Sequence, residues 1–242
     1  MTVADVALRM RGVPSRDLDA FLDRSGAVIL APHPDDESLG CGGLIAAARA
    51  RGRPVSVVFV TDGTGSHPNS RAFPPERLRA TREAEATMAL RFLGVAARDI
   101  TFLRLPDTAA PSDGILFDLT VARIANVARR NGHGGIFAPW RHDPHGYHLA
   151  AHLMAAEVAR RLHLRHWSYP VWGWTLSDRR LLDELSRGAR LDIGEVLPAK
   201  RLAIASHASQ LGGVITDDPD GFQLPADLLG IFEAPYEVFV DA

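Results

Sequence analysis

The sequence predicts an α/β fold, in which one domain is built on a doubly wound, mostly parallel sheet. Short unbroken apolar runs alternate along the chain with longer helical segments, as expected where helices cover both faces of a parallel sheet. The chain has 242 residues, of which 46% are hydrophobic and 23% charged, a balance that excludes disordered and fibrous classes. Because the sequence contains no internal repeat or low-complexity tract, we predict a single domain over residues 1–242.

Five apolar runs are the predicted strands. Ala27–Ala31 and Val55–Thr61 are continuous runs of strand length, which is typical of strands buried on both faces. Three weaker runs of the same kind follow further along the chain: Ile100–Leu103, Gly135–Ala138 and Trp167–Val171. Their alternation with helices predicts right-handed crossover connections.

Helical segments fill the intervals between these runs. Leu39–Ala50 is rich in alanine and ends before Gly52. Pro75–Leu93 begins with proline and ends at Gly94, the usual asymmetry of helix ends. Between residues 117 and 128, apolar residues at 4-3-4 spacing form one stripe. The two remaining predicted helices are Leu149–Leu162 and Pro198–Ser206.

Three loops that carry proline and glycine connect these elements at 62–75, 106–114 and 212–225. We expect all three to lie on the surface of one domain. The loop 212–225 is the predicted mobile lid.

The composition excludes several kinds of protein. With 27 basic and 29 acidic residues the net charge is −2, which does not indicate a nucleic-acid-binding surface. The single cysteine, Cys41, excludes a disulfide framework and a cysteine-rich zinc site, and we predict that it is a small buried hydrophobe. No apolar run approaches the roughly 18 residues of a membrane span, and the N-terminus lacks signal-peptide features. We therefore expect a cytoplasmic protein, for which the sequence neither argues for nor excludes a homo-oligomer.

A first group of polar residues, His33-Pro34-Asp35-Asp36-Glu37, directly follows the first predicted strand. His33 and Asp36 are three residues apart, so a tight turn can bring both side chains to one point. An imidazole and a carboxylate together suit zinc or another divalent transition ion, and Asp35 is left free for other work. The alternative is that the acidic residues cap the following helix. Glycines at 40, 42 and 43 do not complete a dinucleotide-binding motif, and we expect them to allow close helix packing.

A second group runs from Trp140 to His148, after the strand predicted at Gly135–Ala138. If that strand neighbours the first one, both groups meet in one crevice at the switch point of the sheet. His145 and His148 lie three apart at a helix start, so one could bind a metal while the other faces substrate. The histidines at 152, 163 and 166 are expected to be surface or packing residues.

These two groups together resemble the PIG-L/LmbE-like zinc-dependent N-deacetylases. The run Pro-His-Pro-Asp-Asp-Glu and the later His-x-x-His carry the resemblance, which implies a Rossmann-like fold of the LmbE/PIG-L type. Weaker matches follow in the same order along the chain: Thr61-Asp62-Gly63, Arg82 with Glu85, Leu105-Pro106-Asp107 and His207-Ala208-Ser209-Gln210.

The resemblance also implies roles for individual residues. By this match, His33, Asp36 and His148 are zinc ligands, Asp35 is the general base, and His145 stabilises the oxyanion and protonates the leaving amine. The family pattern His-Pro-Asp-His is replaced here by His145-Gly146-Tyr147-His148, so the aspartate that orients the first histidine is missing. Asp143 or Tyr147 could take its place beside His145. In an alternative register, from His142 to His145, His145 itself would be the metal ligand.

The sequence says less about the substrate. Three of four tryptophans fall in the segment 166–174, where Trp172 could stack on a sugar ring or belong to a buried strand and its cap. Arg71, Arg82 and Arg141 could bind a phosphate or carboxylate. For Glu85 we expect a buried ion pair with Arg82.

The sequence therefore predicts a Zn²⁺-dependent enzyme that hydrolyses the N-acetyl amide of an amino sugar or sugar conjugate, with a metal-bound water as nucleophile. Another divalent transition metal could replace zinc. The alternatives are a metal-dependent amidase of a thiol conjugate, a phosphoester hydrolase, and a non-catalytic, metal-stabilised binding module. The expected partner is a small glycan or sugar conjugate, with no nucleic acid and no membrane span.

Overall fold

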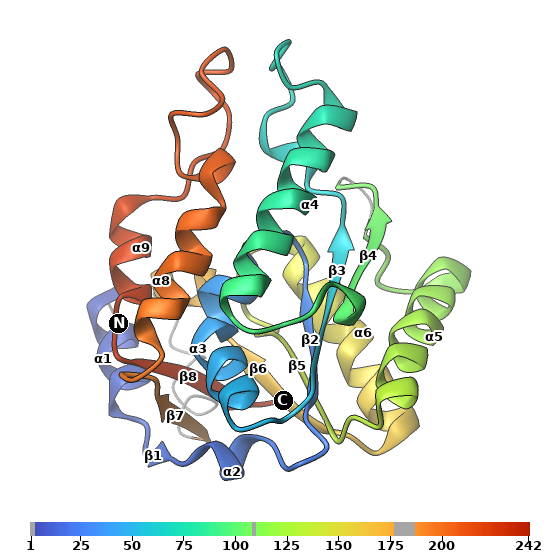
Figure 1. Ribbon diagram of the computed structural model, residues 1–242, viewed down its shortest axis with the longest axis vertical. Helices are drawn as coiled ribbons and strands as arrows, with labels where there is room; N and C mark the ends of the chain where they lie inside the picture. Colours follow the sequence, from blue (N-terminus) through green and yellow to red (C-terminus); the bar gives the residue numbers. More distant parts are fainter. Residues whose placement is uncertain (1–2, 108–109, 177–186) are drawn as a thin grey trace.

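The computed structural model describes residues 3–107, 110–176 and 187–242 and is built on one sheet of eight strands (Figure 1). The strand order is β1-β7-β8-β6-β5-β2-β3-β4. The five strands from β6 to β4 run parallel, and β8 is antiparallel to both of its neighbours, β6 and β7. This mixed but mostly parallel sheet, flanked by helices, confirms the predicted fold class.

The helices and strands have the following bounds. The strands are β1 (Ser15–Arg16), β2 (Ala27–Ala31), β3 (Val55–Thr61), β4 (Ile100–Leu105), β5 (Gly135–Pro139), β6 (Arg165–Tyr169), β7 (Gly188–Asp192) and β8 (Tyr236–Asp241). The α-helices are α1 (Val3–Gly12), α2 (Leu18–Phe21), α3 (Asp36–Ala50), α4 (Pro75–Phe92), α5 (Gly114–Asn131), α6 (Gly146–Leu162), α8 (Leu197–Ser206) and α9 (Ala226–Phe232). Short 3₁₀ turns are η1 (Thr64–Ser66), η2 (Ala97–Asp99), η3 (Trp172–Thr175) and η4 (Ala208–Gln210).

All five predicted strands and all five predicted helices are present. The largest shifts lie at the site, where α3 begins at Asp36 rather than at residue 39 and α6 begins at Gly146 rather than at residue 149. The strand predicted at 167–171 lies two residues earlier, as β6. The helices begin early because the polar residues of their first turns point into the protein, which a pattern of apolar residues does not register. The division into a single domain stays a prediction.

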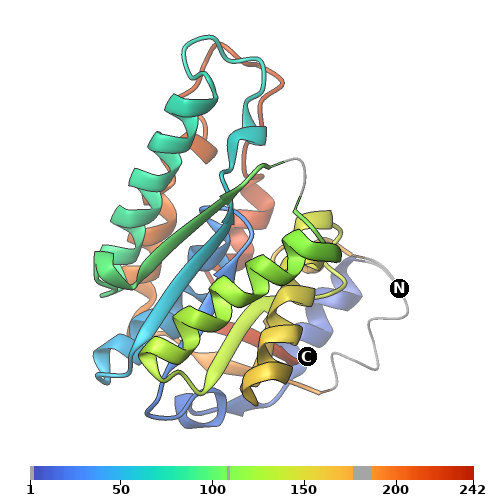
Figure 2. The ribbon, with the colours of Figure 1, turned by 90° about the vertical axis from the view of Figure 1, so that its right-hand side faces the viewer.

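Two layers of helices bury the two faces of the sheet. Figure 2 shows α5 and α6 in front of it, with α4 behind; α3 and α8 pack together, and α8 packs on α4. Alternate residues of β2 supply the two cores, since Ile29 belongs to the core on the side of α3 and α4, and Leu30 belongs to the core beneath α5 and α6. The unbroken apolar run of β2 is thus explained by burial on both faces.

The sheet places the two groups of polar residues beside each other. Ala27–Ile29 of β2 pair in register with Gly135–Phe137 of β5, while β3 lies on the other side of β2. The chain therefore leaves β2 in one direction and β5 in the other, which is the predicted switch point. The segments that follow these two strands meet at the carboxyl edge of the sheet.

Close helix packing explains the glycines of α3. A Cβ atom at Gly40 would lie 2.1 Å from Cδ2 of Tyr169, and one at Gly43 would lie 2.5 Å from Cγ2 of Ile193. Cys41 between them is fully buried, and burial raises the pKa of its thiol well above the usual value. The prediction that Cys41 is a buried hydrophobe is confirmed.

The loops 62–75 and 212–225 lie side by side and form one wall (Figure 1). Asp217 accepts hydrogen bonds from Oγ of Ser70 (2.7 Å) and from the backbone N–H groups of residues 71 and 72 (2.8 Å each). Asp218 accepts the N–H of Asn69 at 2.9 Å, and the N–H of Phe222 donates to the carbonyl of Ser66 at 2.7 Å. These bonds join 212–225 to its partner loop, and the mobile lid stays a prediction.

Within the described ranges, no helix has the length and apolar character needed to cross a bilayer.

His166 in β6 packs against His152 in α6, with ring centroids 5.1 Å apart. Nε2 of His166 is buried and has no hydrogen-bond partner in the described part of the chain. Burial, followed by the neighbouring His152, lowers the pKa of His166 from 6.5 to about 3. The packing role expected for these two histidines agrees with this environment.

The contribution of His166 to stability should therefore become less favourable as the pH falls below neutrality. The unfolded chain binds a proton at His166 near pH 6.5, whereas the folded chain does so only near pH 3, so acid favours unfolding. Between pH 7.5 and pH 5 this one residue should remove about 2 kcal/mol of unfolding free energy, which urea denaturation of the protein and of His166→Asn would measure. The variant should lose correspondingly less stability over this range. His163→Asn, at an exposed histidine, is the matched control, and equal pH slopes for His166→Asn and the wild type would contradict the prediction.

Candidate functional site

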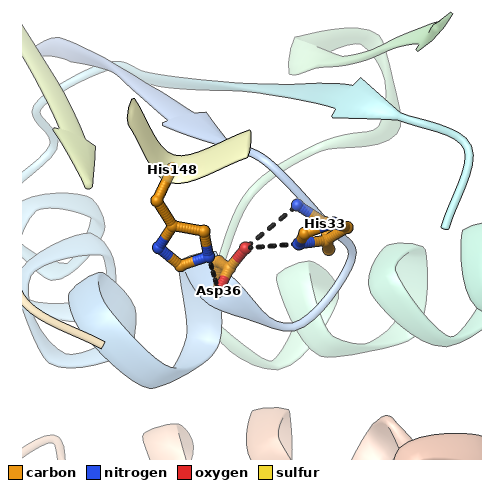
Figure 3. Close-up of side chains that lie close together, drawn as sticks. All are labelled: His33, Asp36 and His148. Carbon is orange, nitrogen blue, oxygen red and sulfur yellow. Dashed lines mark hydrogen bonds and ion pairs between the residues drawn. The ribbon is translucent and has the colours of Figure 1, made fainter. Parts of the chain in front are cut away.

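The turn between β2 and α3 brings His33 and Asp36 together (Figure 3). Nδ1 of His33 lies 3.3 Å from Oδ2 of Asp36, and the same oxygen accepts the backbone N–H of His33 at 3.0 Å. The Asp36 carboxylate is buried in the first turn of α3. Of the helix-cap alternative, only the part on Asp35 is contradicted, since Asp35 occupies the N-cap position but makes no side-chain capping bond.

His148 approaches the same carboxylate from α6 (Figure 3). Its Nε2 atom lies 3.4 Å from Oδ1 of Asp36, is fully buried, and makes no hydrogen bond to any described residue. Its Nδ1 atom lies 2.8 Å from Oδ2 of Asp143. Asp143 is itself buried and accepts N–H groups of Val171 (3.0 Å), Trp172 (3.1 Å) and Gly173. An ionised Asp143 therefore holds the proton on Nδ1 and directs Nε2 toward Asp36.

These three residues fit a divalent transition ion. One ligand atom from each of His33, Asp36 and His148 lies within 4.8 Å of the other two, and no other such cluster occurs in the residues that the structure describes. Two imidazole nitrogens and one carboxylate oxygen are a donor set typical of catalytic zinc, which keeps further positions open. Nε2 of His148, which makes no hydrogen bond to a described residue, is an atom that such an ion would satisfy.

A carboxylate also contacts the second ring nitrogen of each of the two histidines, His33 and His148. Nε2 of His33 lies 2.9 Å from Oδ1 of Asp107, whose other oxygen accepts the N–H of Gly65 at 3.0 Å. Burial lowers the pKa of His33, but Asp107 and Asp36 outweigh it and raise the value to about 9. Likewise Asp36 and Asp143 outweigh burial and raise the pKa of His148 to about 10. Each imidazole thus has a high affinity for positive charge, whether carried by a proton or by a metal ion.

Asp35 lies beside this cluster in a strained backbone conformation. Its φ of +145° falls in a region that residues other than glycine rarely adopt. Oδ2 lies 3.1 Å from Nη2 of Arg82, whose guanidinium also donates to the carbonyls of Pro34 (2.8 Å) and Gly63 (2.9 Å). Burial raises the pKa of Asp35 to about 6, although Arg82 opposes this shift. Asp35 therefore lies outside the three-residue cluster and is paired with Arg82.

The predicted ion pair between Arg82 and Glu85 is wrong. Both carboxylate oxygens of Glu85 are bonded to Ser209, by its N–H at 2.8 Å and by its Oγ at 2.6 Å. Arg82 turns instead to Asp35, because α4 directs residues 82 and 85 toward different neighbours.

A buried pair that the sequence analysis did not identify lies behind Asp35. Oε2 of Glu37 accepts the N–H of Asp35 at 3.0 Å, and Oε1 lies 3.0 Å from Nε2 of His207. Ser38 donates its hydroxyl to the same Oε1 at 2.6 Å. This pair thereby holds the strained peptide of Asp35. In the sequence, Glu37 in the first group of polar residues and His207 in the segment 207–210 were the features that could have indicated this pair.

His145 stands next to the cluster but outside it. Its ring centroid is 5.1 Å from that of His33 and 5.3 Å from that of His148. Nδ1 of His145 is buried without a hydrogen-bond partner among the described residues. Burial, followed by charge on the two neighbouring histidines, lowers the pKa of His145. Asp143 contacts His148 rather than His145, and Tyr147 meets His145 through its ring at 5.1 Å, so neither replaces the missing aspartate.

A pocket of about 280 Å³ opens onto these groups. One side of it is charged, and the other is apolar where Trp172 meets Phe222 edge to face at 6.0 Å. The other tryptophans of the segment 166–174 are buried in the core, whereas Arg71 and Arg141 are exposed and do not line the pocket. The lining residues are His33, Asp35, Asp36, Leu39, Gly65, Ser66, Arg82, Asp107, His145, Tyr147, Trp172, Gln210, Phe222 and Leu224.

Known proteins share this sequence pattern and this fold. The PIG-L family model, described as GlcNAc-PI de-N-acetylase, matches residues 28–159, more than half of the chain. The chain is 28% identical to the 1D-myo-inositol 2-acetamido-2-deoxy-alpha-D-glucopyranoside deacetylase of Nocardia farcinica, over 77% of this chain and 80% of that protein.

Solved structures of deacetylases have the same fold. The A40926 pseudoaglycone deacetylase Dbv21 superposes with a TM-score of 0.70 at 21% identity, covering 90% of this chain and 97% of the other. N,N'-diacetylchitobiose deacetylase from Pyrococcus horikoshii superposes with a TM-score of 0.64 at 22% identity, covering 88% and 78%. The deacetylase-type enzyme that the sequence predicted is thus confirmed at the level of the family. The chain belongs to the PIG-L family.

Proposed function

We propose that the chain is a metal-dependent hydrolase that removes the N-acetyl group of an amino sugar or sugar conjugate. The observation that carries the proposal is the His33–Asp36–His148 cluster, which opens on a pocket beside the buried carboxylate of Asp35. The deacetylase activities in the names of the relatives support the same reaction. The size of the pocket is close to the lower end of the range for small-molecule sites.

His33, Asp36 and His148 would hold the ion, and we propose Zn²⁺. A divalent ion of this kind, when bound, polarises a carbonyl and lowers the pKa of a water molecule toward 7. Asp143 and Asp107 orient the two histidines, so that one nitrogen of each ring stays directed at the site.

Asp35 would act as the general base. Arg82 contacts Oδ2, and no described residue donates a hydrogen bond to Oδ1, so we assign Oδ1 as the atom that receives the proton of the attacking water. Arg82 and Glu37 hold this carboxylate and its peptide in place, which keeps the base from turning away.

His145 would act on the opposite side of the reacting carbon. Its imidazole lines the pocket, where its N–H would donate a hydrogen bond to the carbonyl oxygen and then a proton to the departing nitrogen, although burial and the neighbouring histidines lower its pKa. The rings of Trp172 and Tyr147, which line the pocket, would contact the sugar. For Arg71 and Arg141, recognition of a distant phosphate or carboxylate stays a prediction.

The test is a metal-reconstitution assay. Protein treated with a chelator should release no acetate from N-acetylglucosamine, N,N'-diacetylchitobiose or an N-acetylglucosaminyl-inositol, and reloading with Zn²⁺ should restore release. Acetate and free amine should appear in equal amounts. Turnover of phosphoesters alone would replace the proposal with a phosphoester hydrolase, and turnover of thiol-conjugate amides alone would replace it with an amidase. Stoichiometric metal without turnover would indicate a binding module.

A further inference from the structure

Gln210 lines the pocket from η4 but has no part in the chemistry proposed above. Its side chain is completely buried. Its Oε1 atom accepts no hydrogen bond from the residues that the structure describes. A buried carbonyl oxygen without a donor is unfavourable, so a residue that lines the pocket carries an acceptor without a partner among the described residues.

A chain of hydrogen bonds fixes which end of the Gln210 carboxamide is unpaired. Glu85 accepts two bonds from Ser209, one from the backbone N–H and one from Oγ at 2.6 Å. An ionised carboxylate only accepts, so the single hydroxyl proton of Ser209 is committed to Glu85. Ser209 Oγ must then accept the bond that joins it to Nε2 of Gln210 at 2.9 Å. Nε2 is therefore bonded to Ser209, and Oε1 is the end of the carboxamide that is left without a partner.

The neighbouring groups keep the carboxamide of Gln210 in this orientation, with Nε2 toward Ser209. The backbone of Gln210 is fixed on both sides, since its N–H donates to the carbonyl of His207 at 2.9 Å and its carbonyl accepts the N–H of Leu224 at 2.8 Å. Nε2 also lies 3.5 Å from Oγ of Ser66, a second oxygen on the same side. Rotating the carboxamide would place Oε1 against Ser209, which has no proton to give.

We propose that Oε1 of Gln210 accepts a hydrogen bond from a hydroxyl group of the substrate sugar. Glu85, Ser209 and Gln210 together would then select a substrate that carries a donor at this point. A hydroxyl is the donor that an amino sugar offers besides the amide under attack. This inference rests on the proposed function for its choice of ligand, but the polarity of Gln210 follows from Glu85 and Ser209 alone.

The experiment compares N-acetylglucosamine with its 3-, 4- and 6-deoxyfluoro analogues, because fluorine cannot donate a hydrogen bond. In the zinc-loaded wild type we expect kcat/KM to fall at least tenfold at the position that faces Gln210. Methionine has nearly the same volume as glutamine. In Gln210→Met, the ratio of kcat/KM for N-acetylglucosamine to kcat/KM for the analogue fluorinated at that position should shrink to within about twofold, and the ratios for the other two analogues should not change. Gln223→Met, at an exposed glutamine of the neighbouring loop, should behave as the wild type.

Glu85→Gln gives a second, independent variant. A glutamine at 85 can donate to Ser209 Oγ, which frees the hydroxyl proton for Gln210 and lets its carboxamide turn round. In Glu85→Gln, the difference in kcat/KM between N-acetylglucosamine and the analogue fluorinated at that position should then disappear, although Gln210 is intact. Equal effects of Gln210→Met at all positions, or at none, would overturn the inference. If the wild type released no acetate, the proposed function would fail, and calorimetric binding of the same four sugars would still decide the role of Gln210.

Discussion

Replacing Asp35 with asparagine should lower kcat for acetate release by about a thousandfold and leave the metal bound. Asparagine matches aspartate in shape and tolerates an unusual backbone, but its carboxamide cannot take the proton of water. The three proposed metal ligands are unchanged, and Arg82 keeps its bonds to the carbonyls of Pro34 and Gly63. Steady-state kinetics on the zinc-loaded variant, with its metal content measured by mass spectrometry, would check both halves of the prediction.

His145→Gln is the comparison for this experiment. It removes the proposed proton donor while leaving Asp35 in place, and should lower kcat by about a hundredfold. Full activity of Asp35→Asn with bound zinc would refute the assignment of the base. Loss of zinc from Asp35→Asn would show that this carboxylate belongs to the metal site instead.

Replacing Asp143 with asparagine should weaken zinc binding and destabilise the fold together. The carboxylate accepts four bonds, from Nδ1 of His148 and from three consecutive backbone N–H groups at 171–173. A carboxamide has only one acceptor oxygen, so the buried N–H of Gly173 loses its acceptor even if the other three bonds are kept, and a neutral amide holds the Nδ1 proton of His148 less strongly than a carboxylate does. We expect a 10- to 100-fold loss of zinc affinity, and a loss of about 3 kcal/mol of unfolding free energy without metal.

Competition with a chromophoric chelator would measure the zinc affinity, and urea denaturation of the chelated protein would measure the stability. Asp192→Asn is the matched control, since the exposed Asp192 accepts a single backbone N–H, from Gly194 at 2.8 Å. An Asp143→Asn protein that bound zinc as tightly as the control would show that Asp143 does not orient His148.

The parts of the site that could be predicted are those in which neighbours in the sequence are neighbours in space. His33 and Asp36 share one turn, so their spacing already indicates that they converge. The role of Asp143 could not be predicted in the same way. It lies two residues from His145 and five from His148, and only the path of the chain into α6 decides that it contacts His148.

Long-range partners explain the rest. The spacing of Arg82 and Glu85 on one helix suggested a pair, but Asp35 and Ser209 come from distant segments and outcompete that local contact. β2 and β3 were predictable, because strands buried on both faces are continuously apolar.

β8 was missed for a related reason. Glu237 interrupts its apolar residues, and yet it is buried. It is tolerated there because Lys200 lies 2.7 Å away and the N–H groups of Gly43 and Leu44 donate to it. None of these partners is near it in the sequence.

The wall made by the loops 62–75 and 212–225 ties the pocket to two separate stretches of the chain. Asp217 holds three donors from one short segment, Ser70 to Ala72, so an insertion on either side would pull several bonds out of register at once. The lengths of the two loops are therefore coupled. Any redesign that deepens or widens this pocket would therefore have to change the lengths of both loops together.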